Sequence, residues 1–393
     1  MRYWDRDKTT VVVTGIGIMT AIASDREHTW QKLLQGNSGI KLDPQLQIPV
    51  ARIDDARIDD ARIDKGDNLP SRAQYFLEKV VLEAIADANL KLPLSNCGVV
   101  IGSSRSNQRE LELLLDHPRQ NLNPNYWWNS QSANLSAQIA HLLQTEAPVI
   151  APMAACATGN WAIAQAVELI RSGQCQMAIA GASDAAITPL TIAGFQKINV
   201  LAKSGVYPFS LEREGFALGE GASALVLESL ASAQQRDCHI YGKVLGWGIT
   251  NDAYHATSPN PDNAMAAIAI KDCLRRSHIT AEDIGYINLH GTATQMNDFR
   301  EAQLIQQFSP YVPVSATKGA VGHTLGATGM IEAAFCLLAL RDRLLPPTTG
   351  MQTPAFDLNI IQEAKRSPSL EYALNFSFGF GGQNAIVAFG QYF

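Results

Sequence analysis

The sequence predicts an α/β protein in which helices cover the faces of β-sheets. Short apolar, β-branched runs alternate with longer segments of helical apolar spacing along most of the 393 residues. Such alternation is typical of sheets that carry helices on their faces. The length fits two domains or one large duplicated unit. A composition with 46% hydrophobic residues is sufficient for a sizeable core.

The first predicted element is a buried strand at 9–15, a β-branched run that ends at glycine. The following GIGIMT at 15–20 lacks the third glycine of a dinucleotide fingerprint, so we interpret it as a tight strand-to-helix turn. The next elements are a helix at 71–89, strands at 97–102 and 148–153, a helix at 159–171 and a strand at 177–181.

A pentapeptide repeat, ARIDD-ARIDD-ARID, occupies residues 51–64. A five-residue period puts successive isoleucines about 140° apart on a helix and on alternating faces of a strand, so it builds no apolar face. We interpret the repeat as a surface insertion without a catalytic role. Its regular charge leaves a partner-binding segment as the alternative.

The alternation continues to the C-terminus, and a polar run at 234–238 separates two strand-helix sets. No Pro/Ser-rich linker lies between the sets, so we expect two tightly packed halves, 1–237 and 238–393. The further elements are predicted at 222–227, 240–247, 265–276, 284–290, 330–340 and 386–389.

Charge and composition exclude several function classes. The chain has 31 Lys and Arg against 37 Asp and Glu, the opposite of a nucleic-acid-binding surface. Its apolar stretches fall short of the about 20 residues of a membrane span, and a charged start replaces a signal peptide. The six cysteines form no CxxC pair and have no zinc-finger spacing. We therefore expect a cytoplasmic protein without a bound metal.

The segment AACATG at 154–159 places Cys156 between a strand and the start of a helix. Backbone N–H groups and the helix dipole stabilise a thiolate at such a position, and the small neighbours let a ligand approach closely. This pattern favours a nucleophilic cysteine. Taken alone, it fits a small residue at a crowded helix start equally well.

Three other segments rich in small residues each carry a side chain or loop suited to catalysis. His290 ends a strand before a Gly-Thr turn, and Lys318 precedes His323 by five residues in a glycine-rich stretch. The loop at 376–384 spaces aromatic residues with glycines, which suits a mobile gate and an oxyanion donor. A lone histidine is more often a core residue, but the combination with Cys156 favours a catalytic site.

These four segments, in this order, resemble those of the β-ketoacyl-acyl-carrier-protein synthases, the decarboxylating condensing enzymes of the thiolase superfamily. Two further stretches, 207–222 and 251–257, agree with the pattern. The resemblance covers nearly the whole chain and is strongest to the elongating class with a Cys-His-His triad. It implies a thiolase-like, duplicated five-layer α-β-α-β-α fold and usually a homodimer.

The resemblance also implies a reaction and a partner. Cys156 would take an acyl group from the phosphopantetheine of an acyl carrier protein, so no other cofactor is implied. The backbone N–H groups of Cys156 and Phe380 would form the oxyanion hole, and Phe380 would be the gate. His290 and His323 would donate to the malonyl thioester carbonyl as CO2 leaves, giving a 3-oxoacyl product two carbons longer.

Further residues match supporting positions of the family. Lys318 would lie behind His323 and orient its imidazole, with Glu332 as the partner of the lysine. Three threonines match positions that hydrogen-bond the pantetheine arm: Thr257, Thr292 and Thr294.

The second histidine separates the subclasses. Initiating synthases have asparagine where this chain has His323. Thiolases use a second cysteine as a base, and no later cysteine of this chain lies in a glycine loop. We therefore expect an active acyltransferase of fatty acid, specialised lipid or polyketide synthesis. Two alternatives stay open: a non-condensing partner subunit of a heterodimeric synthase, and an acyltransferase that works without decarboxylation.

The segment SSRSN at 103–107 departs from the family pattern of small and aliphatic residues along the acyl tunnel. Arg105 would bring a guanidinium close to a fatty chain, and an unpaired buried charge is costly. Arg105 must therefore be paired, turn outward or contact a polar substrate. The basic cluster expected to dock an acidic carrier protein is reduced to Lys65 and Arg72. Other candidates for docking are Arg213, Arg275 and Arg276.

Overall fold

A computed structural model describes residues 10–54, 71–116, 127–128 and 130–392. Its main strands follow one hydrogen-bonded path with the order β10-β9-β13-β14-β8-β1-β7-β6-β4-β5, while β2 and β3 pair beside this path and β11 and β12 pair with each other. The N-terminal part of this path contains β1 (Val11–Thr20), β4 (Cys97–Gly102), β5 (Val149–Ile150), β6 (Met177–Ala185) and β7 (Leu218–Ser229). The C-terminal part contains β8 (Gly242–Asn251), β9 (Tyr286–Asn288), β10 (Val314–Ser315), β13 (Tyr372–Gly379) and β14 (Gln383–Gly390).

The two parts of the sheet repeat one topology. In each, the second strand along the chain pairs parallel with the third and fourth strands, whereas the fifth strand pairs antiparallel with the fourth and the first. The two first strands, β1 and β8, pair with each other only over Val11–Val13. The chain is therefore a duplicated unit, although the boundary at residues 237 and 238 stays a prediction.

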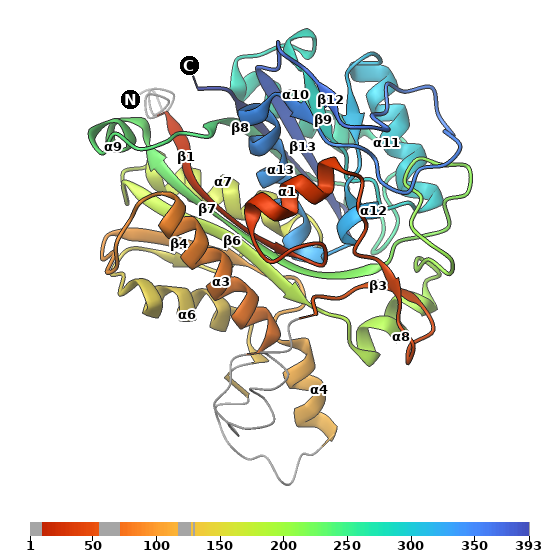
Figure 1. The fold of residues 1–393 in the computed structure, drawn as a ribbon, viewed down its shortest axis with the longest axis horizontal. Coiled ribbons are helices and arrows are strands. Elements are labelled where there is room, and N and C mark those ends of the chain that lie inside the picture. Colours follow the sequence, from red (N-terminus) through yellow and green to blue (C-terminus); the bar gives the residue numbers. More distant parts are fainter. Residues whose placement is uncertain (1–9, 55–70, 117–126, 129, 393) are drawn as a thin grey trace.

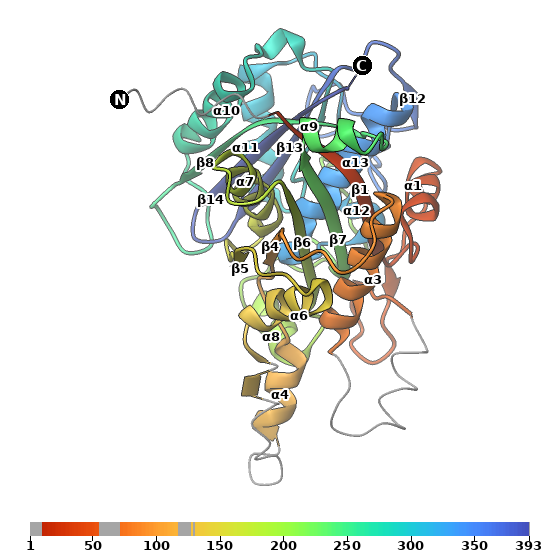
Figure 2. The same ribbon diagram turned by 90° about the vertical axis from the view of Figure 1, so that its left-hand side faces the viewer.

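Helices occupy both outer faces and the space between the two sheets (Figures 1 and 2). The outer face of the N-terminal sheet carries α3 (Arg72–Asp87) and α6 (Ala133–Leu143). The outer face of the C-terminal sheet carries α10 (Ala264–Ser277) and α11 (Gln295–Phe308). Between the sheets lie α7 (Thr158–Arg171) and α13 (Thr328–Asp342). The expected five-layer arrangement is thus confirmed.

Alternation along the strands divides the core into layers. In β7, Ala224 and Val226 pack in the cluster of α3 and α6, whereas Leu225 and Leu227 pack in the cluster of α7 and α13. Because successive side chains of a strand point to opposite faces, a strand buried on both faces is apolar throughout. This explains why the predicted strands appear in the sequence as continuous apolar runs.

Shorter elements connect these layers. They are α1 (Arg26–Leu34), β2 (Lys41–Leu42), β3 (Pro49–Ala51), α4 (Gln108–Asp116), α8 (Pro189–Lys197), α9 (Leu230–Gln235), η2 (Ala281–Asp283), α12 (Lys318–Val321), η3 (Leu325–Ala327), β11 (Leu344–Leu345) and β12 (Lys365–Arg366). Within the described ranges, no helix is long and apolar enough to cross a membrane.

The turn predicted at 15–20 is wrong, because β1 continues through it to Thr20. The two glycines of this segment serve helix packing instead. A Cβ at Gly15 would lie 2.1 Å from the carbonyl oxygen of Ala84, and one at Gly17 would lie 1.9 Å from that of Val80. The absence of Cβ atoms therefore lets α3 lie directly on β1.

The described start of the pentapeptide repeat, residues 51–54, is only partly on the surface: Asp54 is exposed, but two apolar side chains are buried. Ala51 belongs to β3 and is fully buried, and Ile53 packs in the cluster of α3. Residues 55–64 of the repeat lie outside the described residues, as does Lys65. Arg72 is also buried, in an ion pair of 2.7 Å with Glu220, so it is not a docking residue.

Candidate active site

Cys156 lies in a tight turn between β5 and the start of α7. The Thr158 hydroxyl accepts the Ala154 N–H at 2.9 Å and donates to the Ala155 carbonyl at 2.6 Å. Ala155 has φ = 48°, a left-handed conformation that costs a non-glycine residue about 1–2 kcal/mol. The Ser377 hydroxyl of β13 donates to the Cys156 carbonyl at 2.9 Å. These bonds hold the cysteine backbone in a strained, fixed turn against the C-terminal half.

His290 follows β9 and is anchored by a carboxylate that the sequence analysis did not single out. The backbone N–H groups of His290 and Gly291 donate to the two oxygens of Glu301, at 2.5 and 2.8 Å. Glu301 lies on α11, is 1% exposed, and has a pKa raised to about 8 by burial. Asp298 and Glu301 share one face of this helix with buried Ala302 and Ile305. Carboxylates on an apolar helix face were the signal that could have revealed them.

Lys318 contacts His290, so its predicted place behind His323 is wrong. Its Nζ donates to the His290 carbonyl and lies 3.4 Å from His290 Nδ1. Glu332 is the partner expected for the lysine, with an ion pair of 2.7 Å in which both side chains are buried. An ammonium can only donate, so Nδ1 of His290 is the acceptor. The proton of the neutral imidazole is therefore on Nε2.

His323 is held by a different set of groups. Its backbone N–H donates to the Ala217 carbonyl at 2.8 Å, and its Nδ1 lies 3.0 Å from the Thr328 hydroxyl. The His323 ring meets the Phe216 ring edge-on at 4.9 Å and the His290 ring at 5.5 Å. The structure therefore brings the two predicted histidines together, each with one ring nitrogen already occupied.

Burial controls the protonation states in this site. Desolvation lowers the pKa of His290 and His323 well below the ordinary value, and the Lys318 charge lowers both further. Both imidazoles are therefore neutral at neutral pH. Burial raises the pKa of Cys156 to about 12, more than the Lys318 and Arg105 charges and the Phe380 N–H lower it. The thiolate stabilisation expected from the helix start is thus outweighed by desolvation, which favours the neutral thiol.

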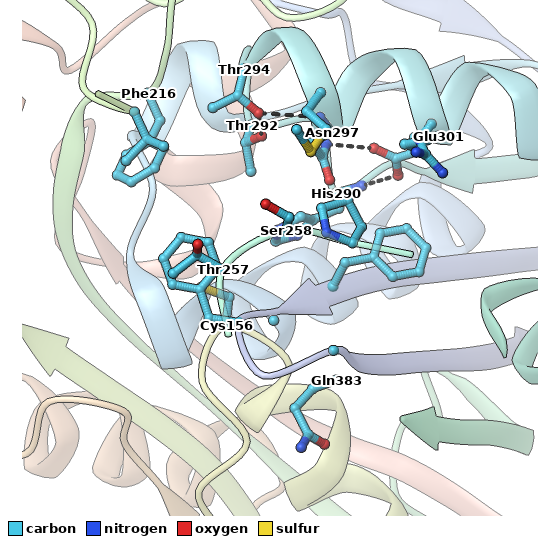
Figure 3. A pocket seen from close by; sticks show the side chains of 18 of the residues that line it. Cys156, Phe216, Thr257, Ser258, His290, Thr292, Thr294, Asn297, Glu301 and Gln383 are labelled. Atoms are coloured by element: carbon cyan, nitrogen blue, oxygen red, sulfur yellow. Dashed lines mark hydrogen bonds between the residues drawn. The ribbon is translucent and has the colours of Figure 1, made fainter. Parts of the chain in front are cut away.

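A pocket of about 330 Å³ opens onto the sulfur and the two imidazoles (Figure 3). The three predicted threonines line it: Thr257 at an exposed position, and Thr292 and Thr294 with their hydroxyls 2.9 Å apart. Thr294 also caps the start of α11 by accepting the Asn297 N–H. The pocket thus connects a hydroxyl-lined wall to the Cys156 side chain.

A second pocket shares four lining residues with the first: Cys156, Phe195, Phe380 and Gln383. The Phe380 ring lies 6.2 Å from that of Phe195. The next two residues are glycines with φ of 77° and 75°, a conformation that glycine adopts without strain. Arg105 lies in the wall of the second pocket and not in the first.

Comparisons with known proteins decide the family. The profile "Beta-ketoacyl synthase, N-terminal domain" matches residues 8–233, and the profile "Beta-ketoacyl synthase, C-terminal domain" matches residues 241–352. The chain belongs to the β-ketoacyl synthase family. The expected recognition, thiolase-like fold and acyltransferase class are thereby confirmed, and the chain is a condensing enzyme of this type.

Relatives of this β-ketoacyl synthase cover nearly its whole length. It is 34% identical to 3-oxoacyl-[acyl-carrier-protein] synthase 2 of Synechocystis sp. (strain ATCC 27184 / PCC 6803 / Kazusa), over 98% of this chain and 99% of the relative. The solved structure of the ishigamide ketosynthase/chain length factor is similar with a TM-score of 0.90 and 28% identity, over 98% of this chain and 100% of that one. The solved structure of a type II polyketide ketosynthase in complex with its acyl-carrier protein is similar with a TM-score of 0.88 and 26% identity, over 98% of this chain and 100% of that one.

Proposed function

We propose that this β-ketoacyl synthase elongates acyl chains by decarboxylative condensation, with Cys156 as the nucleophile. The observation that carries the proposal is the meeting of the cysteine sulfur with two neutral imidazoles in one pocket. In the first step, the sulfur attacks the thioester carbonyl of an acyl-carrier protein and the pantetheine thiol leaves. Because the free thiol form is favoured, the thiol proton passes to the leaving pantetheine thiolate as the carbon–sulfur bond to the carrier breaks.

The second step uses the imidazoles as hydrogen-bond donors. The carbonyl oxygen of a malonyl thioester accepts from His290 and His323, the carbon–carbon bond to the carboxylate breaks, and CO2 leaves. The electron pair stays on the resulting enolate, which the two donors stabilise. Its carbon then attacks the acyl-Cys156 carbonyl, the carbon–sulfur bond to Cys156 breaks, and the cysteine thiolate takes up a proton from water. The product is a 3-oxoacyl thioester longer by two carbons, still on the carrier protein.

The Phe380 backbone supports the oxyanion assignment. Its N–H is directed at the cysteine sulfur, where it lowers the pKa of the thiol. A donor in this place, with the Cys156 N–H, can stabilise the negative oxygen that forms when the acyl carbonyl is attacked. The flanking glycines allow the Phe380 ring to move as the acyl group enters.

The acyl carrier protein is the proposed partner, as the names of the relatives suggest. The pantetheine arm would enter along the wall of Thr257, Thr292 and Thr294, whose hydroxyls suit its amide groups. Of the predicted docking residues, Arg275 is exposed, while Arg213 lies with its guanidinium 4.8 Å from the Phe356 ring centre. The cytoplasmic location stays a prediction.

The alternatives are less well supported. A non-condensing subunit has no need of a complete set of Cys156, His290, His323 and Lys318. An acyltransferase without decarboxylation has no need of two donors that face one carbonyl. We therefore retain the active elongating synthase as the conclusion.

The test is intact-protein mass spectrometry with acyl- and malonyl-carrier proteins. We expect an acyl adduct on Cys156 that disappears when malonyl-carrier protein is added, together with a ketoacyl product two carbons longer. Cys156→Ser abolishes the adduct, whereas the matched control Cys238→Ser, at a partly exposed thiol, retains it. An adduct that persists after malonyl addition contradicts condensation, and one retained in Cys156→Ser excludes this nucleophile.

A further inference from the structure

Cys156 also lines a second pocket, which includes Phe380 but none of the three threonines of the first pocket. Most of its lining is apolar, including Phe195, Leu325 and the backbone turn before the cysteine. The polar side chains in this wall are those of Ser104, Arg105 and Gln383. Given the proposed function, on which this inference rests, a pocket that reaches the sulfur here receives the chain of the acyl group.

The backbone of Arg105 is clamped in place by a buried carboxylate. Asp184 on β6 accepts the Arg105 N–H at 2.9 Å and the Ser104 N–H at 3.1 Å. It also accepts the Ser103 hydroxyl at 2.6 Å and the Gly326 N–H at 2.7 Å. Asp184 is fully buried, so this loop is part of the rigid scaffold. The carboxylate is occupied by these donors and makes no hydrogen bond to the guanidinium.

The Arg105 side chain lies over an aromatic ring. Its guanidinium carbon is 5.3 Å from the centre of the Phe195 ring, which is a cation–π distance. Among the residues that the structure describes, no carboxylate, carbonyl or hydroxyl accepts a hydrogen bond from this guanidinium. Of the three possibilities that the sequence left open, pairing with an acidic or polar group is therefore not observed, and the half-buried side chain lines the pocket. The planar group keeps its donors for a ligand.

The chemistry of the pocket distinguishes between acyl donors. A saturated chain would cover the guanidinium without replacing its hydrogen bonds to water, which is unfavourable. A carboxylate at the end of a short chain would accept two parallel N–H bonds and neutralise the charge. The Gln383 amide adds a donor to the same wall, whereas the Ser104 hydroxyl donates to Asp184 at 3.0 Å.

We propose that this pocket selects short acyl donors that end in a carboxylate, and that Arg105 is the specificity-determining residue. The substrates of this class are the mono-thioesters of dicarboxylic acids on the carrier protein. The enzyme would then extend an ω-carboxyacyl chain by two carbons, instead of a saturated fatty chain.

The test compares three acyl groups of the same shape on one carrier protein: glutaryl, 5-oxohexanoyl and 5-methylhexanoyl. They end in a carboxylate, a methyl ketone and an isopropyl group. The rate of Cys156 acylation is followed by intact mass. We expect glutaryl to react about 10- to 100-fold faster than 5-methylhexanoyl, as charge-assisted hydrogen bonds allow, with the ketone between them. Adipoyl and succinyl analogues define the length.

Two variants make the test specific. Arg105→Gln should remove the preference for glutaryl and leave 5-methylhexanoyl acylation intact or faster, which also shows that the variant folds. Arg366→Gln, at an exposed position on β12, should keep the wild-type preference. Equal rates for all three groups, unchanged in Arg105→Gln, would overturn the inference and leave the condensing function standing. A preference for the ketone over the carboxylate would also overturn it. Failure of every donor to acylate Cys156 would instead contradict the proposed function.

Discussion

His290 and His323 show how burial defines the role of a residue. Both are about 2% exposed, and both have one ring nitrogen occupied by a neighbouring group, the Lys318 ammonium or the Thr328 hydroxyl. For His290 the ammonium fixes the proton on Nε2, and such a preorganised donor needs no reorganisation as charge develops on the substrate. The lysine beside His290 thus contributes by fixing a tautomer as well as by its charge.

Removal of either donor should slow decarboxylation. We expect His290→Ala and His323→Ala each to reduce CO2 release from malonyl-carrier protein by about 100- to 1,000-fold, the typical effect of losing one oxyanion donor. Release of labelled CO2 measures this step separately from the acylation of Cys156. The control His141→Ala, at an exposed site on α6, should be unaffected. A loss below threefold in either variant would exclude that histidine as a donor.

The Cys156 thiol should titrate at high pH. Because burial raises its pKa to about 12, the thiolate fraction grows about tenfold per pH unit throughout the range below that value. Alkylation by iodoacetamide should therefore accelerate from pH 7 to 9.5 without a plateau. Lys318→Met removes a charge that lowers this pKa, so its alkylation should be slower at every pH. A plateau near neutral pH in the wild type would show a preformed thiolate instead.

At the scale of elements, close contact between β1 and α3 supports the N-terminal half. β1 carries glycines at the two positions where a Cβ would overlap the backbone of α3. This contact lies on the outer face of the N-terminal sheet, the sheet that leads into the Cys156 turn. Since backbone atoms on both sides are fixed by their own hydrogen bonds, neither element can move away at low cost.

Gly17→Ala should destabilise the protein by about 3 kcal/mol or more, because overpacking against a backbone carbonyl cannot be relieved by a rotamer change. The matched control is Gly194→Ala on α8, where a Cβ would meet nothing within 4 Å. That substitution should be neutral or stabilise the helix by about 0.5–1 kcal/mol. Urea unfolding followed by circular dichroism gives both values. Equal stability of the two variants would disprove the packing argument.

At the scale of the whole molecule, one end of the described structure carries apolar residues that suit a subunit interface. β5 ends the strand order and pairs with β4 on one side only among the described residues. α4 and α8 lie at the same end of the molecule in both views (Figures 1 and 2). The exposed apolar side chains of these segments include Leu115 (64%), Val149 (43%) and Leu190 (57%). An exposed sheet edge and apolar side chains of this size favour association.

We expect the chain to sediment as a homodimer, as the sequence predicts. Leu115→Asp with Leu190→Asp should shift the equilibrium to monomer, because each places a charge in an apolar contact. The control Tyr311→Asp changes a residue that is 86% exposed and lies outside α4, β5 and α8, and should remain dimeric. Analytical ultracentrifugation separates the outcomes. A monomeric wild type that dimerises only with a related synthase would favour the heterodimer.

The sequence by itself determined the α/β class, most of the long strands and helices, the residues proposed to react and the family. It did so because these depend on local patterns: β-branched runs buried on both faces, small residues at strand ends, and a cysteine before a helix. The duplication was implied only by the resemblance, and it is the pairing of strands in the folded chain that shows it.

Only the tertiary structure decided how the reactive groups act. Lys318 contacts His290 and not His323, burial keeps Cys156 protonated, and Glu301 anchors the histidine backbone. The Arg105 loop is held by a carboxylate 79 residues away in sequence. These contacts and protonation states depend on which distant segments meet and on how much water they exclude. A local sequence pattern holds no information on distant contacts or on solvent exclusion, so the orientation and protonation of the site residues could be established only from the folded chain.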